Sequence, residues 1–280
     1  MELPLKIDLT GKVAVVTGGG GVLCSVLAEA LARCGAKVAL LDRSAAGGHP
    51  QRLRDMGLTV NGYRCDVLDK ESIVSCHKQI LSDFGPCDIL INGAGGNNPR
   101  ANTDKEYFEP GDIDGDTKSF FDLEREGFEA VFNLNFLGTL LTTQVFAADM
   151  LSGKPASVIN ISSMSAYAPL TKVPAYSGAK SAINNFTSWL AVHFKNTGIR
   201  VNAIAPGFFV TSQNRDLLFD GEGKPTARTE KILAATPMGR FGEAEELVGT
   251  LLWLVDSKAS GFVTGVVIPV DGGFNAYSGV

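Results

Sequence analysis

Residues 13–24 read Val-Ala-Val-Val-Thr-Gly-Gly-Gly-Gly-Val-Leu-Cys, and this stretch decides the fold. It begins with four apolar residues, which predict a strand buried on both faces of a sheet. Four glycines follow, and the amphipathic stretch Leu23–Cys34 predicts a helix. Between a buried strand and a helix, a glycine turn lets the backbone approach a pyrophosphate, and the helix N-terminus favours the negative charge. A glycine run alone would equally suit a flexible turn, so its position carries the prediction.

The same strand-then-helix pattern recurs along the rest of the chain. Helix-length amphipathic stretches such as Glu71–Phe84 separate most of the short apolar runs. Strands that alternate with helices predict an α/β fold, here a Rossmann-type doubly wound parallel sheet in a single domain over residues 1–280. The runs that predict strands are Val13–Thr17, Lys37–Leu41, Thr59–Arg64, Ile89–Asn92, Ser157–Ile161, Arg200–Ala205 and Val266–Val270.

Two segments interrupt this alternation. Residues 97–122 form a polar insert rich in Asn, Asp and Gly, and residues 208–236 form a second irregular stretch. Loops this long inside a compact domain are usually functional lids or disordered insertions. Both segments follow the carboxyl end of a predicted strand, the edge where open α/β sheets bind ligands. We expect both segments to shape the substrate site, with residues 208–236 as its lid.

Composition and charge narrow the possible partners. The net charge of −5 gives no indication of a nucleic-acid or anionic-membrane partner. The first ten residues lack a long apolar run, so no secretory signal is expected, and no apolar stretch reads as a membrane span. The five cysteines follow no metal-ligand spacing, which favours reduced thiols in a cytoplasmic protein without a metal site.

A carboxylate at the end of the second predicted strand bears on the choice of cofactor. Asp42 stands in Leu40-Leu41-Asp42-Arg43, where it can accept hydrogen bonds from an adenosine ribose diol and repel a 2′-phosphate. This favours NAD over NADP. Arg43 leaves NADP open, because an arginine there can pair with a 2′-phosphate. A solvated residue at a strand end is the alternative interpretation of Asp42.

The pair Tyr176 and Lys180 carries the most chemical information. Four residues apart on a helix, their side chains share one face. A nearby ammonium favours the phenolate form of tyrosine, which lowers its pKa toward the range useful for acid–base catalysis. Such pairs also arise by chance on helix surfaces, so the rest of the chain must support the interpretation.

Seven motifs occur in the order and spacing of the short-chain dehydrogenase/reductase family, which the chain resembles over roughly residues 9–274. Each motif is weak singly, but their order is hard to explain otherwise. The motifs are the glycine turn, Asp66 in Cys65-Asp-Val67, Asn92-Gly-Ala-Gly95, Asn135 in residues 133–138, Ser163 thirteen residues before Tyr176, Pro206-Gly207 with Thr211, and Asp271-Gly-Gly273.

The resemblance implies a role for each matching residue. Tyr176 would be the general acid or base, Ser163 would hydrogen-bond the same substrate oxygen, and Lys180 and Asn135 would complete the catalytic set. One departure is plain, because Val22 and Cys24 replace the later glycines of the family's turn, which puts the pyrophosphate geometry in doubt. The implied cofactor residues are Gly18, Gly21, Val22, Leu23, Asp42, Arg43, Asp66, Val67, Asn92, Ala94, Gly95, Tyr176, Lys180, Pro206, Gly207, Phe209 and Thr211.

The two irregular segments are expected to select the substrate. Asn97 and Asn98 can exchange hydrogen bonds with hydroxyls, and Arg100 can clasp a carboxylate. Arg215, with Gln213 and Asn214, would close from the other side, and Ser163 and Tyr176 would face the reacting carbon. Amides plus arginine suit a sugar acid, although each is equally interpretable as a solvated loop residue.

The long insert beginning Gly-Gly-Asn-Asn-Pro-Arg also resembles that of short-chain enzymes that interconvert D-fructuronate and D-mannonate. A gluconate 5-dehydrogenase or another sugar-acid or polyol dehydrogenase is the alternative enzyme, and a non-catalytic nucleotide-sensing protein is the alternative of another class. By the same resemblance we expect a homotetramer, in which Trp253 and Phe262 are either interface or core residues.

Overall fold

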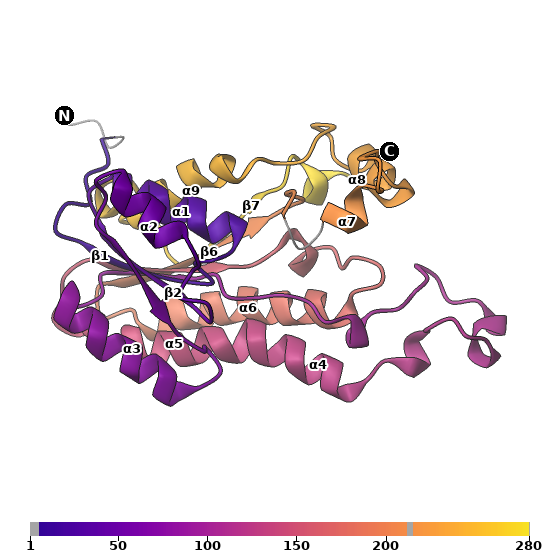
Figure 1. The fold of residues 1–280 in the computed structure, drawn as a ribbon, viewed down its shortest axis with the longest axis horizontal. Helices are drawn as coiled ribbons and strands as arrows, with labels where there is room; N and C mark the ends of the chain where they lie inside the picture. Colours follow the sequence, from indigo (N-terminus) through magenta and orange to yellow (C-terminus); the bar gives the residue numbers. More distant parts are fainter. Residues whose placement is uncertain (1–5, 212–214, 280) are drawn as a thin grey trace.

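The computed structural model describes residues 6–211 and 215–279 and is built around one parallel sheet (Figure 1). Its seven strands are ordered β3-β2-β1-β4-β5-β6-β7. This confirms the predicted fold class, and each predicted strand agrees with the observed one to within one residue at either end. The strands are β1 Val13–Thr17, β2 Lys37–Asp42, β3 Val60–Arg64, β4 Ile89–Asn92, β5 Ala156–Ile161, β6 Ile199–Pro206 and β7 Val267–Val270.

Helices cover both faces of the sheet (Figure 1). One face carries α1 (Val22–Arg33), α2 (His49–Asp55) and α9 (Val248–Val255). The other carries α3 (Lys70–Asp83), α5 (Gly138–Phe146) and α6 (Pro174–His193). The remaining helices are α4 Arg125–Phe132, α7 Arg215–Leu218, α8 Ala227–Ala234 and α10 Ser257–Ser260, with a π-helical turn η4 at Asn133–Leu137 and 3-10 turns η1 Pro99–Ala101, η2 Pro110–Asp114, η3 Phe120–Asp122, η5 Asp149–Ser152, η6 Met164–Ala166, η7 Ala244–Leu247 and η8 Phe274–Ala276.

Alternate residues of β1 enter two separate cores. Ala14 and Val16 pack into the core beneath α1 and α9. Val13 and Val15 pack into the core beneath α3, α5 and α6. Successive strand residues point to opposite faces, so an all-apolar run is required where both faces are covered. Burying such side chains stabilises the fold by about 25 cal/mol for each Å² of apolar surface removed from water.

The order of the strands positions the ligand-binding crevice. Parallel β2 pairs with one edge of β1 and β4 pairs with the other. The connections after β1 and β4 therefore run in opposite directions, and the crevice opens at the carboxyl ends of these two strands. The glycine turn follows β1, and Asn92-Gly-Ala-Gly95 follows β4, so both motifs lie at this crevice.

The expectation that no segment could span a membrane needs a qualification. The continuous helical run of residues 125–152 is long and apolar enough to do so by length and composition. Core helices pass the same test, and Val131, Asn135 and Phe146 of this run are buried in the protein. The predicted cytoplasmic location stays a prediction.

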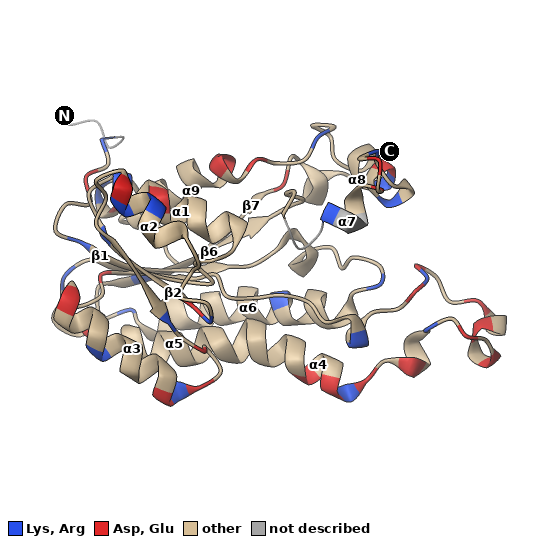
Figure 2. Ribbon diagram, in the orientation of Figure 1, with Lys and Arg blue, Asp and Glu red and all other residues tan. Residues whose placement is uncertain are grey.

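The insert and the lid segment lie at the carboxyl edge of the sheet. Residues 97–122 extend beyond α4 (Figure 1), and the 3-10 turns η1, η2 and η3 shape them. The lid segment, residues 208–236, contains α7 and α8. Figure 2 shows acidic residues along the ribbon of the insert, and the sequence of residues 97–122 has seven Asp and Glu residues against three Lys and Arg residues.

Candidate active site

The glycine turn is fixed by contacts between the ends of β1 and β4. Thr17 Oγ1 accepts hydrogen bonds from the backbone N–H groups of Gly93 (3.0 Å) and Ala94 (3.1 Å). Gly18 has φ +68°, and a Cβ there would lie 2.9 Å from Ala94 Cα. Only glycine accommodates both conditions. Helix α1 begins at Val22, after Gly21, so its free N–H groups face the crevice where an anion can bind.

The departure from the family's glycine pattern has a structural explanation. Cys24 is buried against Gly93, and a Cβ on Gly93 would lie only 2.2 Å from Cys24 Sγ. Gly93 follows Asn92 at the end of β4, and Cys24 stands where the family's turn has its last glycine. The Cys24 thiol thus fills the space beside Gly93, which has no side chain, and the ends of β1 and β4 stay close together. Burial raises the pKa of the Cys24 thiol to about 12, so the side chain is a neutral filler at pH 7.

Asp42 is held as a carboxylate beside the glycine turn. Although burial opposes ionisation, hydrogen bonds from Ser44 and from the Gly20 N–H hold the pKa of Asp42 below its ordinary value. The Gly20 N–H lies 3.2 Å from Asp42 Oδ2. The carboxylate therefore carries its charge at the end of β2, where the 2′-hydroxyl or 2′-phosphate of a dinucleotide would lie.

Asn92 does not reach the crevice with its side chain. Its Nδ2 donates to Thr143 Oγ1 and Asn160 Oδ1, both at 2.9 Å, and its Oδ1 accepts from Thr142 Oγ1 at 2.7 Å. The amide thus joins β4 to β5 and α5. Both amide hydrogens are donated within the protein, so the side chain ties these elements together, and the predicted contact of Asn92 with the cofactor stays a prediction.

Ser163 follows β5 and begins the 3-10 turn η6. Its Oγ accepts hydrogen bonds from Ser165 N (3.2 Å) and Ser165 Oγ (3.0 Å). Because the oxygen receives both, the Ser163 proton is available for a third partner. Ser165 is buried and was missed by sequence reasoning, since nothing in the Ser-Ser-Met-Ser run distinguishes its members.

Tyr176 and Lys180 lie on one face of α6, as predicted. Lys180 is 5% exposed, and its Nζ donates to Ile161 O at 2.8 Å and lies 5.6 Å from the centre of the Tyr176 ring. Burial lowers the pKa of Lys180 to about 8. Burial also raises the pKa of the Tyr176 phenol, and a hydrogen bond with Ser163 partly offsets the rise.

The expected lowering of the Tyr176 pKa by Lys180 is absent from this arrangement of the described residues. The ammonium is directed at the Ile161 carbonyl and lies over the ring, whereas burial acts on the phenol itself. The phenol therefore keeps its proton at neutral pH, which suits a proton donor.

Asn135 lies in the π-helical turn between α4 and α5. Its Nδ2 donates to Gly96 O (2.7 Å) and Val131 O (2.8 Å), and its Oδ1 accepts from Gly96 N (3.3 Å). A Cβ on Gly95 would lie 2.7 Å from Asn135 Oδ1 and 3.2 Å from Lys180 Nζ. Asn135 thus fixes the Gly95–Gly96 segment beside Lys180, and both of its amide hydrogens are donated to backbone carbonyls. A π-helical turn often marks a functional position in a helix.

Other predicted cofactor residues line the crevice edge. Pro206 ends β6, and Gly207 N donates to Val270 O at 2.9 Å. A Cβ on Gly207 would lie 2.6 Å from Asp271 Cα, so the close contact between the Pro-Gly and Asp-Gly-Gly motifs requires glycine at position 207. Phe209 is buried and Thr211 partly buried in the same segment. Leu23 and Arg43 lie near the glycine turn.

Asp66 and Val67 follow the end of β3. Asp66 is exposed and accepts a hydrogen bond from Leu68 N, while Val67 is buried.

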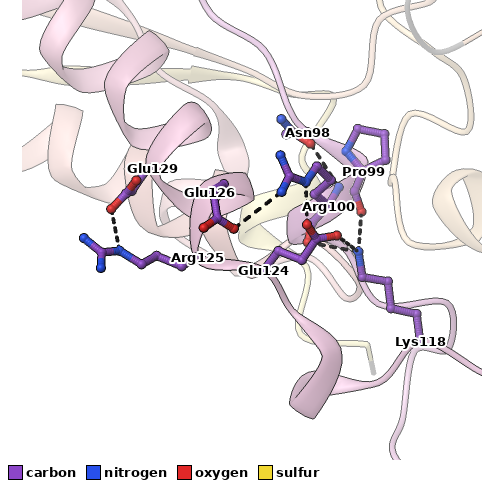
Figure 3. A network of polar contacts seen from close by, with 8 residues as sticks. All are labelled: Asn98, Pro99, Arg100, Lys118, Glu124, Arg125, Glu126 and Glu129. Atoms are coloured by element: carbon purple, nitrogen blue, oxygen red, sulfur yellow. Dashed lines mark hydrogen bonds and ion pairs between the residues drawn. The ribbon is translucent and has the colours of Figure 1, made fainter.

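Arg100 differs most from its predicted role. Its Nε lies 2.5 Å from Glu124 Oε2, and its Nη2 lies 3.4 Å from Glu126 Oε2. Figure 3 shows the guanidinium between the two carboxylates, with Lys118 on the other side of Glu124. In this arrangement the guanidinium is paired with two protein carboxylates, and its predicted contact with a substrate carboxylate stays a prediction. The sequence could not show this, because Glu124 is twenty-four residues away.

The remaining predicted substrate residues have varied surroundings. Asn97 Nδ2 donates to Asn102 Oδ1, and Asn98 Oδ1 accepts from Arg100 N, so both amides shape the start of the insert. Arg215 is exposed, with its guanidinium 5.7 Å from the centre of the Phe219 ring. Gln213 and Asn214 lie outside the described residues.

Comparisons with known proteins agree with this geometry. A family model described as enoyl-(acyl carrier protein) reductase matches residues 23–275. The chain belongs to the short-chain dehydrogenase/reductase family. It is 58% identical over 282 residues to an uncharacterized oxidoreductase of Haemophilus influenzae, covering 100% of this chain and 99% of the relative. It is 33% identical to the gluconate 5-dehydrogenase of Gluconobacter oxydans, covering 98% of both chains.

Among solved structures, the chain is similar to a candidate D-mannonate oxidoreductase from Haemophilus influenzae with bound NAD. The two share 58% identity and a TM-score of 0.94, and the match covers 100% of each chain. As a short-chain dehydrogenase/reductase, the protein is an oxidoreductase, in agreement with the activity class predicted from Tyr176, Lys180 and the surrounding motifs.

Proposed function

We propose that this protein is an NAD(H)-dependent oxidoreductase that interconverts D-fructuronate and D-mannonate. The arrangement of Ser163, Tyr176 and Lys180 at the crevice carries the reaction class. The 58% identity to a candidate D-mannonate oxidoreductase that binds NAD supports both the substrate and the cofactor. The ionised Asp42 beside the glycine turn supports NAD over NADP, since its charge would repel a 2′-phosphate.

In this proposal each residue of the crevice has a separate role at the substrate carbonyl. When bound, the nicotinamide supplies or receives the hydride at the substrate carbon. During reduction Tyr176 donates its phenolic proton to the carbonyl oxygen, and the raised pKa keeps that proton in place at neutral pH. The Ser163 hydroxyl, which is hydrogen-bonded with Tyr176 in this structure, would turn its proton to the same substrate oxygen as negative charge develops there.

Lys180 and Asn135 support this proton transfer by positioning the groups around Tyr176. The Lys180 ammonium lies over the Tyr176 ring in a cation–π contact that holds the two side chains together on one face of α6. Asn135 holds Gly96 and the backbone around it, which fixes the segment that lies beside Lys180. In the oxidative direction the same residues act in reverse, with Tyr176 accepting the hydroxyl proton.

A substrate panel tests the proposal. Initial rates of NADH consumption would be measured with D-fructuronate, 5-keto-D-gluconate and the neutral D-fructose, and then with NADPH. We expect the highest kcat/KM for D-fructuronate with NADH. A preference for D-fructose would contradict the sugar-acid assignment, and a preference for NADPH would contradict the role of Asp42.

Two alternatives give different results in the same panel. The 33% identity to a gluconate 5-dehydrogenase favours 5-keto-D-gluconate as the substrate, and the highest kcat/KM would then fall on that compound. A nucleotide-sensing protein would bind NADH without turnover on any carbonyl. The complete set of Ser163, Tyr176, Lys180 and Asn135 supports an enzyme over a sensor, since nucleotide binding alone does not require all four.

A homotetramer is proposed on the same resemblance. Trp253 packs partly buried against the core under α9, whereas Phe262 is fully exposed. Phe262 is therefore the better interface candidate of the two. Light scattering on the wild type and on Phe262→Asp would test this, and a smaller assembly is expected for the variant.

A further inference from the structure

The proposed function needs a cation for the substrate carboxylate, and Arg100 is occupied by Glu124 and Glu126. The insert itself is unsuited to an anion, because its seven carboxylates outnumber its three cations. A cation on another element, nearer Tyr176 in the chain and without a carboxylate partner in direct contact, is the better candidate for binding the substrate carboxylate. The following inference rests on the proposed function and deepens it.

Lys172 stands on the loop that leads into α6, four residues before Tyr176. Its φ is +71°, which is uncommon for a residue with a side chain and costs conformational energy. The conformation is held in place because Lys172 O accepts a hydrogen bond from Thr103 N of the insert at 3.0 Å. A lysine kept where glycine would fit more easily indicates that its side chain serves a purpose.

The Lys172 loop is continuous with the wall of the catalytic crevice. Ala101 of the insert, Ala175 and Tyr176 pack in one apolar cluster. Lys172 itself is partly buried, and its ammonium forms no direct ion pair with a described residue. It is therefore a cation on the segment that leads to Tyr176, without a carboxylate in direct contact.

Helix α8 of the lid adds two further cations to the same place. Lys231 Nζ lies 2.9 Å from Glu106 Oε2, which joins the lid to the insert. Lys172 and Arg228 also act on the Glu106 carboxylate through their charges. One direct ion pair and two longer-range attractions therefore act on the Glu106 carboxylate, and these four residues together carry two more positive charges than negative ones.

We propose that Lys172 binds the carboxylate of the sugar-acid substrate, within the cation cluster that it forms with Arg228 and Lys231 around Glu106. The backbone bond from Thr103 and the loop to Tyr176 fix the base of the Lys172 side chain. The carboxylate and the reacting carbonyl would then be held by one short segment, with the carboxylate at Lys172 and the carbonyl at Tyr176. Such a clamp would select acids over neutral sugars.

The direct test compares Lys172→Gly, Lys172→Arg and Arg100→Gln on D-fructuronate and D-fructose. Glycine suits the left-handed backbone, so Lys172→Gly removes the charge without adding strain. We expect KM for D-fructuronate to rise about 10- to 100-fold, the loss typical of a hydrogen bond to a charged group. KM for D-fructose and the Kd for NADH should not change, Lys172→Arg should retain most of the affinity, and Arg100→Gln should resemble the wild type.

A second variant predicts an effect of opposite sign. Glu106→Gln removes the only carboxylate of the cluster and should lower KM for D-fructuronate by about 2- to 5-fold, the size of an exposed charge effect. If Lys172→Gly leaves the acid KM unchanged, or if Arg100→Gln raises it as strongly, the assignment to Lys172 is wrong.

Failure of the proposed substrate can be recognised separately. If the wild type does not reduce D-fructuronate, competitive inhibition of its best ketone substrate by D-gluconate still reports carboxylate binding. Inhibition that is lost in Lys172→Gly and kept in Arg100→Gln would support the clamp with another substrate. Inhibition equal in all three proteins, or absent from the wild type, would overturn it.

Discussion

The floor of the crevice and its roof are built by different means. The floor comprises the ends of β1, β4 and β5 with η4 and α6, and its polar side chains are nearly inaccessible, as Asn135 at 1% and Lys180 at 5% exposure illustrate. The roof comprises the insert and the lid segment. Its charged side chains are exposed to solvent, as the side-chain exposures of Arg100 (52%) and Lys231 (67%) illustrate.

This difference determines how each region responds to change. Among the described residues, no buried side-chain nitrogen or oxygen lacks a hydrogen-bond partner. Removing one member of such a network leaves another buried group unsatisfied, which costs about 1–3 kcal/mol. Exposed ion pairs contribute about 0–1 kcal/mol, so the roof can exchange charges at little cost to folding. The floor therefore fixes the reaction, and the roof is free to select the substrate.

The strongest test of the floor is Tyr176→Phe. We expect kcat to fall about 100- to 10,000-fold, the usual contribution of a positioned proton donor. The Kd for NADH, measured by fluorescence, should change little. Near-normal turnover would show that another group supplies the proton.

The pH dependence of stability tests whether Lys180 is buried as described. Its pKa falls to about 8 in the folded protein from 10.5, so the unfolded chain binds more protons between these values. The free energy of unfolding should therefore rise from about pH 8 to 10.5, by at most about 3 kcal/mol.

The matched control is Lys180→Met, in which this rise should disappear. Cys24 acts in the opposite sense, because its folded pKa of about 12 exceeds its ordinary 9.0 and its contribution is lost as the pH rises above 9. Cys24→Ala separates the two effects. Equal pH profiles for the wild type and Lys180→Met would mean that Lys180 is solvated.

A double substitution tests the packing of Cys24 against Gly93. Gly93→Asn should destabilise the protein by about 1–3 kcal/mol, since its Cβ would lie 2.2 Å from Cys24 Sγ. Cys24→Gly on the same chain should recover most of that loss, measured by chemical unfolding. Additive effects of the two substitutions would show that the residues do not depend on each other.

The same contrast explains what could be predicted from the sequence. The strands, the glycine turn and the Tyr176–Lys180 pair follow local periodicity and spacing, which residues 13–24 and 174–180 display directly. The partners of Asn92 and Arg100 lie up to 68 residues away and depend on tertiary contacts. Lys172 gave no signal, because the left-handed conformation that distinguishes it is a property of the folded backbone.

The smallest effect is expected in the roof, at the ion pair of Arg100 and Glu124. Arg100→Gln and Glu124→Gln should each destabilise the protein by less than about 1 kcal/mol, with a coupling energy of about 0.2–1 kcal/mol that weakens in high salt. The double-mutant cycle, measured by chemical unfolding, isolates the pair from the other contacts of each residue. A coupling above 2 kcal/mol would place the pair with the buried networks of the floor. The roof would then be a rigid part of the fold, and its charges could not be exchanged to select a substrate without loss of stability.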